Sequence, residues 1–266
     1  AVAGTILQAL VRTPLADPYV LGVVQGGSFG AVVVLAIGTG AMGHAAMSAA
    51  AFAGALLCLV LVLGFGRQRG RVVPTRLVLA GIAIGYAFSA ATDFIELRIT
   101  EGESLAGVLF WLLGTVATAS WSDLGIPTAI VLASLVWLLL QARSLNALLA
   151  GEETAAALGV DVPRLRVRLL VVSSLLTGAV VAVAGGVAFV GLVIPHVARL
   201  VVGVDHRRML PVVALVGAVF LVLVDLVART AAAPLELPLS VITAAIGAPF
   251  FLWLMRRADA PDGGVA

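Results

Sequence analysis

Residues 168–203 read RLLVVSSLLTGAVVAVAGGVAFVGLVIPHVARLVVG, an almost uninterrupted apolar run. A membrane-spanning helix takes about 20 apolar residues, so this run is too long for one ordinary crossing. Two adjacent glycines, Gly185 and Gly186, fall near its middle, and glycine is common where a helix stops. The run therefore predicts two consecutive membrane spans, 168–188 and 189–203, which separate at this glycine pair.

The composition of the whole chain also indicates a membrane environment. Of its 266 residues, 62% are hydrophobic and 11% are charged, whereas a soluble domain has roughly a quarter charged residues. The alternating segments typical of membrane barrels are absent, so we predict an all-α polytopic membrane protein with about eight full transmembrane helices. The predicted spans cover residues 19–37, 45–65, 76–97, 124–141, 168–188, 189–203, 209–229 and 239–255.

Two further apolar segments are too short for a full span. The first ends near Leu10 and is interpreted as the remnant of a helix whose beginning is missing. The second runs from Leu105 to Thr118. Because it cannot cross a bilayer at full thickness, we predict an interfacial or partly inserted helix.

The positions of the arginines predict the orientation of the spans. Cytoplasmic loops are enriched in basic residues, and only Arg98 and Arg229 fall on the opposite side when the predicted spans alternate. The other arginines share one side: Arg12, Arg67, Arg69, Arg71, Arg76, Arg143, Arg164, Arg166, Arg168, Arg199, Arg207, Arg208, Arg256 and Arg257. We therefore predict that the 142–167 loop and the C-terminus are cytoplasmic.

The loop at 142–167 is long and polar, although loops between helices usually contain only a few residues. Its centre reads GEETAAALGV, residues 151–160. Two glutamates after the first glycine favour the first turn of a helix, Gly159 is a typical helix stop, and Pro163 predicts the start of a second short helix. Two short surface helices are suited to docking a partner. The alternative is an amphipathic loop that only lies on the lipid headgroups.

Four stretches of the sequence, taken together, resemble a known transporter family. They are RTPLADPYVLGVVQGGSFGA (12–31), GEETAAALGV (151–160), GGVAFVGLVIPHVARLVVGVDHRRMLP (185–211) and DLVARTAAAPLELPLSVITAAIGAPFFLWLM (225–255). In this order they resemble the FecCD family of ABC permeases, the type II importers of iron chelates, haem and vitamin B12. The resemblance covers residues 1–266 as a single transmembrane permease domain, and it implies that the family's first span and part of the second are missing.

The resemblance also implies roles for particular residues. In the family, a coupling helix seats in a groove of the ATPase subunit. The matching residues are Gly151, Glu152, Glu153, Ala156, Leu158 and Gly159. Pro74 and Thr75 match the family's cytoplasmic gate, and a simple turn that opens the next helix is the alternative. Arg229 matches an outer position that docks the binding protein; alternatively, it pairs with Asp225, four residues earlier on the same helix face.

We expect the chain to be a transport subunit and not an enzyme. It contains no GxxxxGK[ST] phosphate-binding loop and no recognisable catalytic constellation. ATP and Mg are therefore expected on a partner ATPase, and no cofactor or metal is expected on this chain. The GTGAMG stretch at 38–43 matches GxGxxG, but it lacks the acidic residue that should follow in a dinucleotide site.

These features predict the permease of an ATP-driven ABC importer that moves iron chelates, such as Fe(III)-siderophores, or haem or cobalamin, by alternating access. The expected partners are two copies of an ATPase subunit, a second permease copy or close paralogue, an extracytoplasmic substrate-binding protein and the lipid bilayer, but no nucleic acid. The expected location is the bacterial inner (cytoplasmic) membrane. The alternative is an ion- or proton-coupled secondary transporter, which would place acidic residues deep within several spans.

Overall fold

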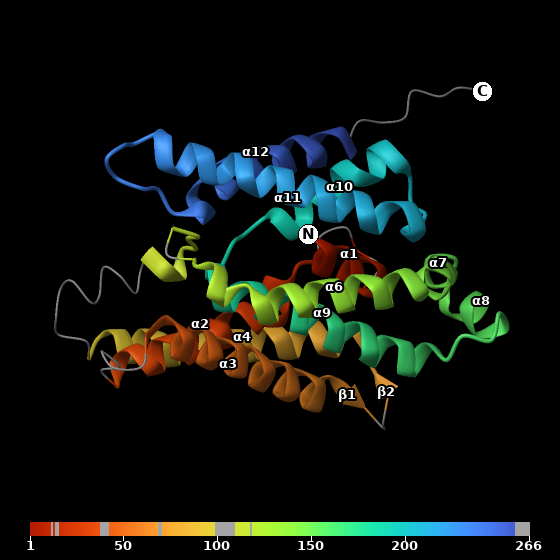
Figure 1. The fold of residues 1–266 in the computed structure, drawn as a ribbon. Coiled ribbons are helices and arrows are strands. Elements are labelled where there is room, and N and C mark those ends of the chain that lie inside the picture. Colours follow the sequence, from red (N-terminus) through yellow and green to blue (C-terminus); the bar gives the residue numbers. More distant parts are fainter. Residues whose placement is uncertain are drawn as a thin grey trace.

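The computed structural model describes residues 1–11, 13, 16–37, 43–68, 71–98, 110–117 and 119–258. Within these ranges the chain forms a bundle of helices with a small two-stranded hairpin (Figure 1). The elements are α1 (Val2–Val11), η1 (Pro18–Leu21), α2 (Val23–Ala36), α3 (Gly43–Gly66), β1 (Arg67–Gln68), β2 (Arg71–Val72), α4 (Pro74–Glu96), η2 (Trp121–Asp123), α6 (Gly125–Leu140), α7 (Ala142–Leu149), α8 (Glu152–Ala157), α9 (Val162–Ala184), α10 (Val190–Val202), α11 (His206–Thr230) and α12 (Leu239–Ala258).

The predicted spans all coincide with helices, although these helices differ in length. In the described ranges, four helices are long and apolar enough to cross a membrane: α3, α4, α9 and α11. A fifth candidate is the pair α6 and α7, which bends by 61°. The all-α polytopic fold is confirmed, whereas the predicted spans 19–37, 189–203 and 239–255 fall on the shorter apolar helices α2, α10 and α12.

Backbone breaks explain why some of these helices are short. Gly22 has a φ of 71° between η1 and α2, and Gly185 has a φ of 67° at the end of α9. Glycine adopts this left-handed region without the steric penalty of a Cβ atom. Phe189 has a φ of 66° just before α10 begins. The predicted break at Gly185–Gly186 is therefore confirmed, and α10 leaves in a new direction.

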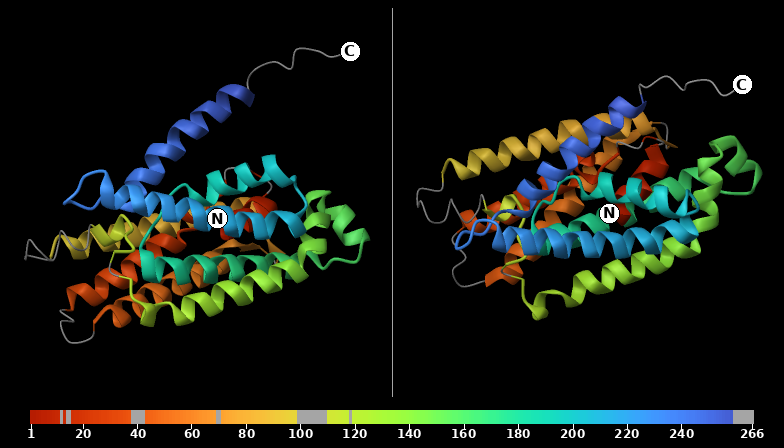
Figure 2. Two further views of the ribbon diagram at one scale, coloured as in Figure 1. Left: turned by 45° about the horizontal axis from the view of Figure 1, so that its top comes forward. Right: turned by 90° about the horizontal axis from the view of Figure 1, so that it is seen from above.

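The helix nearest the N-terminus lies in the middle of the bundle (Figures 1 and 2). Ile6, Leu7 and Leu10 of α1 are each at most 2% exposed. The helix packs against α9, α10 and α11. The segment that the sequence presents as a short remnant thus contributes to the main hydrophobic core.

Small residues bring α2 and α3 into close backbone contact. A Cβ atom on Gly30 would lie 2.0 Å from the Ala50 carbonyl oxygen, and one on Gly54 would lie 2.1 Å from the Gly26 oxygen. Membrane helices commonly associate through such small residues, because apolar side chains gain little by leaving lipid. The α2–α3 pair therefore forms a tightly packed part of the bundle.

Only part of the predicted interfacial helix, 105–118, lies within the described ranges. In that part, Trp111 is 6% exposed. The Thr115 amide donates to the Ala184 carbonyl at 2.9 Å, and the Leu239 amide donates to the Gly114 carbonyl at 2.9 Å. Residues 110–117 are therefore anchored to the end of α9 and the start of α12. The GTGAMG residues 38–42 lie outside the described ranges.

The connections that carry most arginines gather at one end of the bundle. The β1–β2 hairpin, α7, α8 and the start of α11 lie at the right-hand end in Figure 1, which we call the α8 end. The turn between α11 and α12 lies at the opposite end. These arginine-rich connections thus lie at one end of the bundle, as expected if they share one side of the membrane.

Candidate functional site

A short exposed helix, α8, forms from the GEETAAALGV segment. Gly151 precedes it with a φ of 122°, and Gly159 follows it with a φ of 81°. Both angles lie in regions that favour glycine. Glu152 and Glu153 occupy the first turn, where a carboxylate is stabilised by the positive end of the helix dipole. The helix that the sequence predicts here is present.

Most of the predicted coupling residues lie on the outer surface of α8 and of the turn that follows it. Ala155 is fully buried against the rest of the protein. In contrast, Glu153, Ala156 and Gly159 are exposed, and Leu158 is 69% exposed. The outward face therefore combines small residues, one acidic residue and one exposed leucine, which is a surface that a partner groove could cover.

Glu152 connects α8 to the long helix α9. Its carboxylate accepts a hydrogen bond from the guanidinium of Arg166. The Arg166 side chain is 9% exposed and that of Glu152 is 46% exposed. A largely buried guanidinium needs such a partner, because an uncompensated buried charge is costly. Glu152 therefore fixes α8 onto α9, a contact that the sequence reasoning did not identify.

The sequence predicts that Pro163 opens a second short helix. This prediction is wrong, because the helix that starts there is the long helix α9. Pro163 lies in the first turn of α9, which continues without interruption from Val162 to Ala184. The Asp161 side chain caps this helix by accepting from the Arg164 amide at 3.1 Å. Proline at the first turn is compatible with a helix of any length. The additional short helix instead precedes α8, as α7.

Asn146 connects α7 to the start of α11. Its side-chain nitrogen donates to Asp205 Oδ1 at 2.7 Å. Its side-chain oxygen accepts from the His206 amide at 3.0 Å and lies 2.8 Å from His206 Nδ1. Asp205 also caps α11 by accepting from the Arg207 amide at 3.0 Å. The hydrogen bonds from Asn146 and then from the Arg207 amide lower the pKa of Asp205 below its usual value.

The two polar contacts together make α7 and α8 a bridge between long helices. Glu152 holds α8 on α9, and Asn146 holds α7 on α11. Leu145 and Leu148 of α7 are fully buried and complete this corner of the bundle. The α7–α8 segment is therefore attached to both α9 and α11. Sequence reasoning missed Asn146, because its partners are 59 and 60 positions away.

The predicted gate residues lie where the β1–β2 hairpin leads into α4. Pro74 opens α4 in its first turn, as the turn interpretation expects. Thr75 is exposed. In the hairpin, Arg67 pairs with Val72 and Gln68 pairs with Arg71. Since a gate between subunits needs a second chain, the gate role of Pro74 and Thr75 stays a prediction.

Arg229 lies in the last turn of α11, at the end of the bundle opposite α8. Its Nε atom donates to Asp225 Oδ2 at 2.9 Å, and its side chain is 44% exposed. The predicted ion pair is therefore present. The guanidinium still reaches solvent, so docking of a binding protein stays a prediction that is compatible with the pair.

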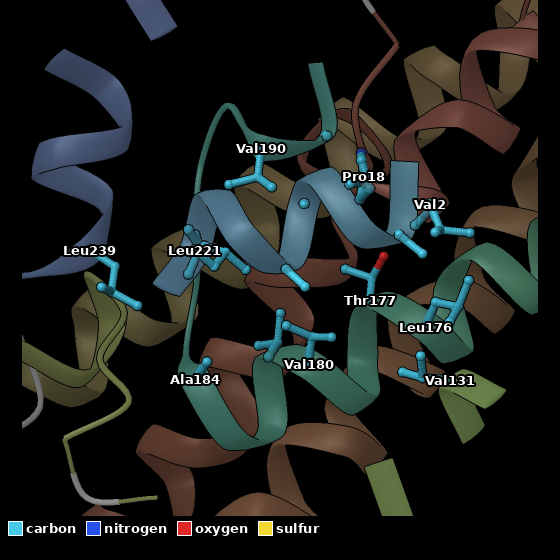
Figure 3. Close-up of a pocket in the computed structure, with 18 of the residues that line it drawn as sticks. Val2, Pro18, Val131, Leu176, Thr177, Val180, Ala184, Val190, Leu221 and Leu239 are labelled. Carbon is cyan, nitrogen blue, oxygen red and sulfur yellow. The ribbon is translucent and has the colours of Figure 1, made fainter. Parts of the chain in front are cut away.

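An apolar cavity of about 510 Å³ lies between α1, α9, α10 and α11. Figure 3 shows Val2, Val180 and Leu221 directed toward it from different helices. This volume is within the usual range of small-molecule pockets, and the lining is almost entirely apolar. The described ranges contain no group of three or more His, Cys, Asp or Glu residues that could hold a metal ion.

Comparisons with known proteins agree with this architecture. Residues 1–257 match the FecCD transport family. The cobalamin import system permease BtuC of Halobacterium salinarum is 43% identical, over 97% of this chain and 69% of its own length. The chain belongs to the FecCD transport family. It is therefore a multi-pass permease of the ABC importer type, as the sequence motifs predict.

Other relatives of this FecCD permease show the same extent of similarity. The hemin transport system permease HmuU of Yersinia pestis is 40% identical, over 97% of this chain and 77% of its own length. A solved structure, described as an inward-facing conformation of a metal-chelate type ABC transporter, superposes with a TM-score of 0.89. It is 33% identical, and the match covers 97% of this chain and 81% of that chain.

Proposed function

We propose that this permease is the membrane subunit of an ATP-driven importer and that α8 transmits the movement of a separate ATPase to the membrane helices. One observation carries the proposal: α8 is exposed, yet it is fixed to α9 by Glu152 and Arg166. Its neighbour α7 is fixed to α11 by Asn146. An exposed element fixed to two long helices is suited to shifting a bundle between outward-open and inward-open states.

The proposed cargo is a metal chelate. The candidates are an iron chelate such as an Fe(III)-siderophore, haem and cobalamin. Cobalamin and hemin appear in the names of two relatives, and a solved relative is described as a metal-chelate type transporter. All three candidates are large metal complexes with an organic ligand. Uptake assays with each candidate would identify the cargo.

The proposed assembly has partners at both ends of the bundle. Two ATPase subunits, which carry ATP and Mg, would dock at the α8 end, in the cytoplasm. A substrate-binding protein would dock at the opposite end, where Arg229 is 44% exposed. A second permease copy or a close paralogue would complete the path through the cytoplasmic membrane. The arginine-rich connections at the α8 end support this orientation and a cytoplasmic C-terminus.

Co-purification with the ATPase tests the proposed docking. Ala156→Arg and Leu158→Arg place a bulky charge on the exposed face of α8 and on the turn that follows it. We expect each to reduce ATPase binding by about tenfold or more, a loss of about 1.4 kcal/mol. Leu235→Arg is the matched control, because Leu235 is 73% exposed at the opposite end. If both α8 variants retain the ATPase, or if uptake continues undiminished without any ATPase, the proposal fails and a secondary transporter is favoured.

A further inference from the structure

A polar pocket of about 480 Å³ lies between α7, the 158–161 connection and the start of α9. Three arginines line it: Arg143 from α7, and Arg164 and Arg168 from α9. Asp161 is the carboxylate in the lining, and it pairs with Arg164 Nε at 3.1 Å. The pocket therefore keeps an excess of positive charge.

Two of these arginines have unused hydrogen-bonding capacity. Among the residues that the structure describes, Arg143 and Arg168 form no ion pair with a carboxylate. Both side chains belong to exposed residues and line the same pocket, together with Ser144 and Gln141. A guanidinium presents several N–H groups in one plane, and this geometry matches the oxygens of a phosphate group. The chemistry of the pocket favours an anion with several oxygens.

The pocket lies where two membrane helices change from apolar to polar. The apolar helix α6 ends at Leu140, and Gln141 of the pocket follows directly. On α9, the lining residue Arg168 comes directly before buried Leu169 and Leu170. Basic side chains at such a boundary reach the headgroup region of a bilayer. Helix α8 lies farther out, at the end of the bundle (Figure 1).

An exposed apolar strip on α6 leads to this boundary. Leu132 is 57% exposed, Val136 is 58% exposed and Leu140 is 75% exposed. Residues spaced by four lie on one face of a helix, so these side chains form a strip that ends at Leu140, the residue before Gln141 in the sequence. A strip of this kind next to a basic pocket matches the two parts of a phospholipid, its acyl chains and its phosphate.

We propose that this pocket binds the phosphate group of an anionic phospholipid. Arg143 and Arg168 are the main phosphate ligands, and the acyl chains lie along Leu132, Val136 and Leu140. Basic pockets between membrane helices on the cytoplasmic side are known to hold anionic headgroups. The bound lipid would bridge α7 and α9 directly above α8. Leu158 and Gly159 of the predicted coupling surface also line this pocket, so the site adjoins the proposed ATPase surface, but lipid binding itself requires only membrane embedding.

Native mass spectrometry of the purified permease tests the site. The protein is titrated with phosphatidylglycerol or with phosphatidylcholine of the same acyl chains, and we expect it to retain phosphatidylglycerol in preference. The double variant Arg143→Gln/Arg168→Gln should lose this preference by about tenfold or more. The control is Arg207→Gln/Arg208→Gln, which removes two exposed arginines from the same end but outside the pocket. The single variants Arg143→Gln and Arg168→Gln serve if the double variant does not fold.

Four outcomes would overturn the proposal. The first is equal retention of the two lipids by the unaltered protein. The second is a pocket variant that keeps its preference, or a control that loses it to the same extent. The third is displacement of phosphatidylglycerol by inorganic phosphate at the same concentration, which would indicate a site for a free anion. The fourth is a pocket variant that releases the ATPase but still retains phosphatidylglycerol, which would show that the arginines bind the ATPase and not a lipid.

Discussion

The α2–α3 pair and the corner formed by α7 and α8 are held together in different ways. In the pair, glycines bring the backbones so close that an added Cβ atom would lie about 2 Å from a carbonyl oxygen. The corner is instead connected to the long helices by directed hydrogen bonds: Asn146 donates to Asp205, and Glu152 accepts from Arg166. The difference teaches that side-chain volume fixes the helices of the pair, whereas a few polar atoms attach α7 and α8 to the long helices.

The largest effect is expected from filling the α2–α3 contact. Gly30→Leu must separate the helices, because its Cβ atom would lie 2.0 Å from the Ala50 carbonyl oxygen. Overpacking usually costs about 1–3 kcal/mol and more where backbone is in the way. We expect loss of most monodisperse protein in size-exclusion chromatography. Gly64→Leu is the control, since nothing lies within 4 Å of a Cβ there. A Gly30→Leu variant as stable as this control would refute the close-packing account.

The next largest effect is expected at Asn146. Asn146→Ala removes a partner from His206, which is 3% exposed, and leaving a buried polar group unsatisfied costs about 1–3 kcal/mol. We expect the Asn146→Ala permease to bind its ATPase, which still hydrolyses ATP. The amount of cargo taken up per ATP hydrolysed should fall severalfold. Leu149→Ala, on the same helix at a residue that is 45% exposed, should keep the ratio. If cargo uptake per ATP hydrolysed is unchanged in Asn146→Ala, α7 has no role in coupling.

A smaller effect is expected at Glu152. Glu152→Gln keeps a hydrogen-bond acceptor for Arg166 but removes the opposite charge. Because Glu152 is 46% exposed, solvent screens the pair and the loss of stability should be about 1 kcal/mol or less. The thermal unfolding midpoint measures it, and Glu153→Gln, the exposed neighbour, is the control. Equal midpoints for the two variants would show that Glu152 does not fix α8.

The smallest effect on stability is expected for the exposed pair at the opposite end. Asp225→Asn should change the thermal unfolding midpoint very little, because solvent screens an exposed ion pair. Arg229→Gln should change it as little. If Arg229 docks the binding protein, however, only Arg229→Gln should weaken that interaction, as measured by titration calorimetry. Equal weakening by both variants would indicate that the pair acts as a unit and not Arg229 alone.

The sequence predicts the features that depend on local patterns. The long apolar run and its glycine pair predict the break at Gly185, and the GEETAAALGV segment predicts α8. Both signals lie within a few residues of the element they describe. The central position of α1 could not be predicted in this way, because an apolar helix does not specify its neighbours.

The contacts that connect α8 to the bundle could not be predicted from the sequence. Asn146 and Asp205 are 59 residues apart, and Glu152 and Arg166 are 14 residues apart. Each pair meets only because the intervening helices fold back. The prediction for Pro163 failed for a related reason: a proline indicates where a helix starts but not where it ends.

Cross-linking from α8 to the ATPase tests the central claim most directly. A reagent that joins a thiol to a lysine amine is applied to Ala156→Cys, in which the native Cys58 is buried, and Leu235→Cys at the opposite end is the control. We predict an ATPase cross-link from position 156 that changes in yield when ATP is added, and none from position 235. A cross-link from 235 but not from 156, or none from either in a complex that transports, would contradict the account.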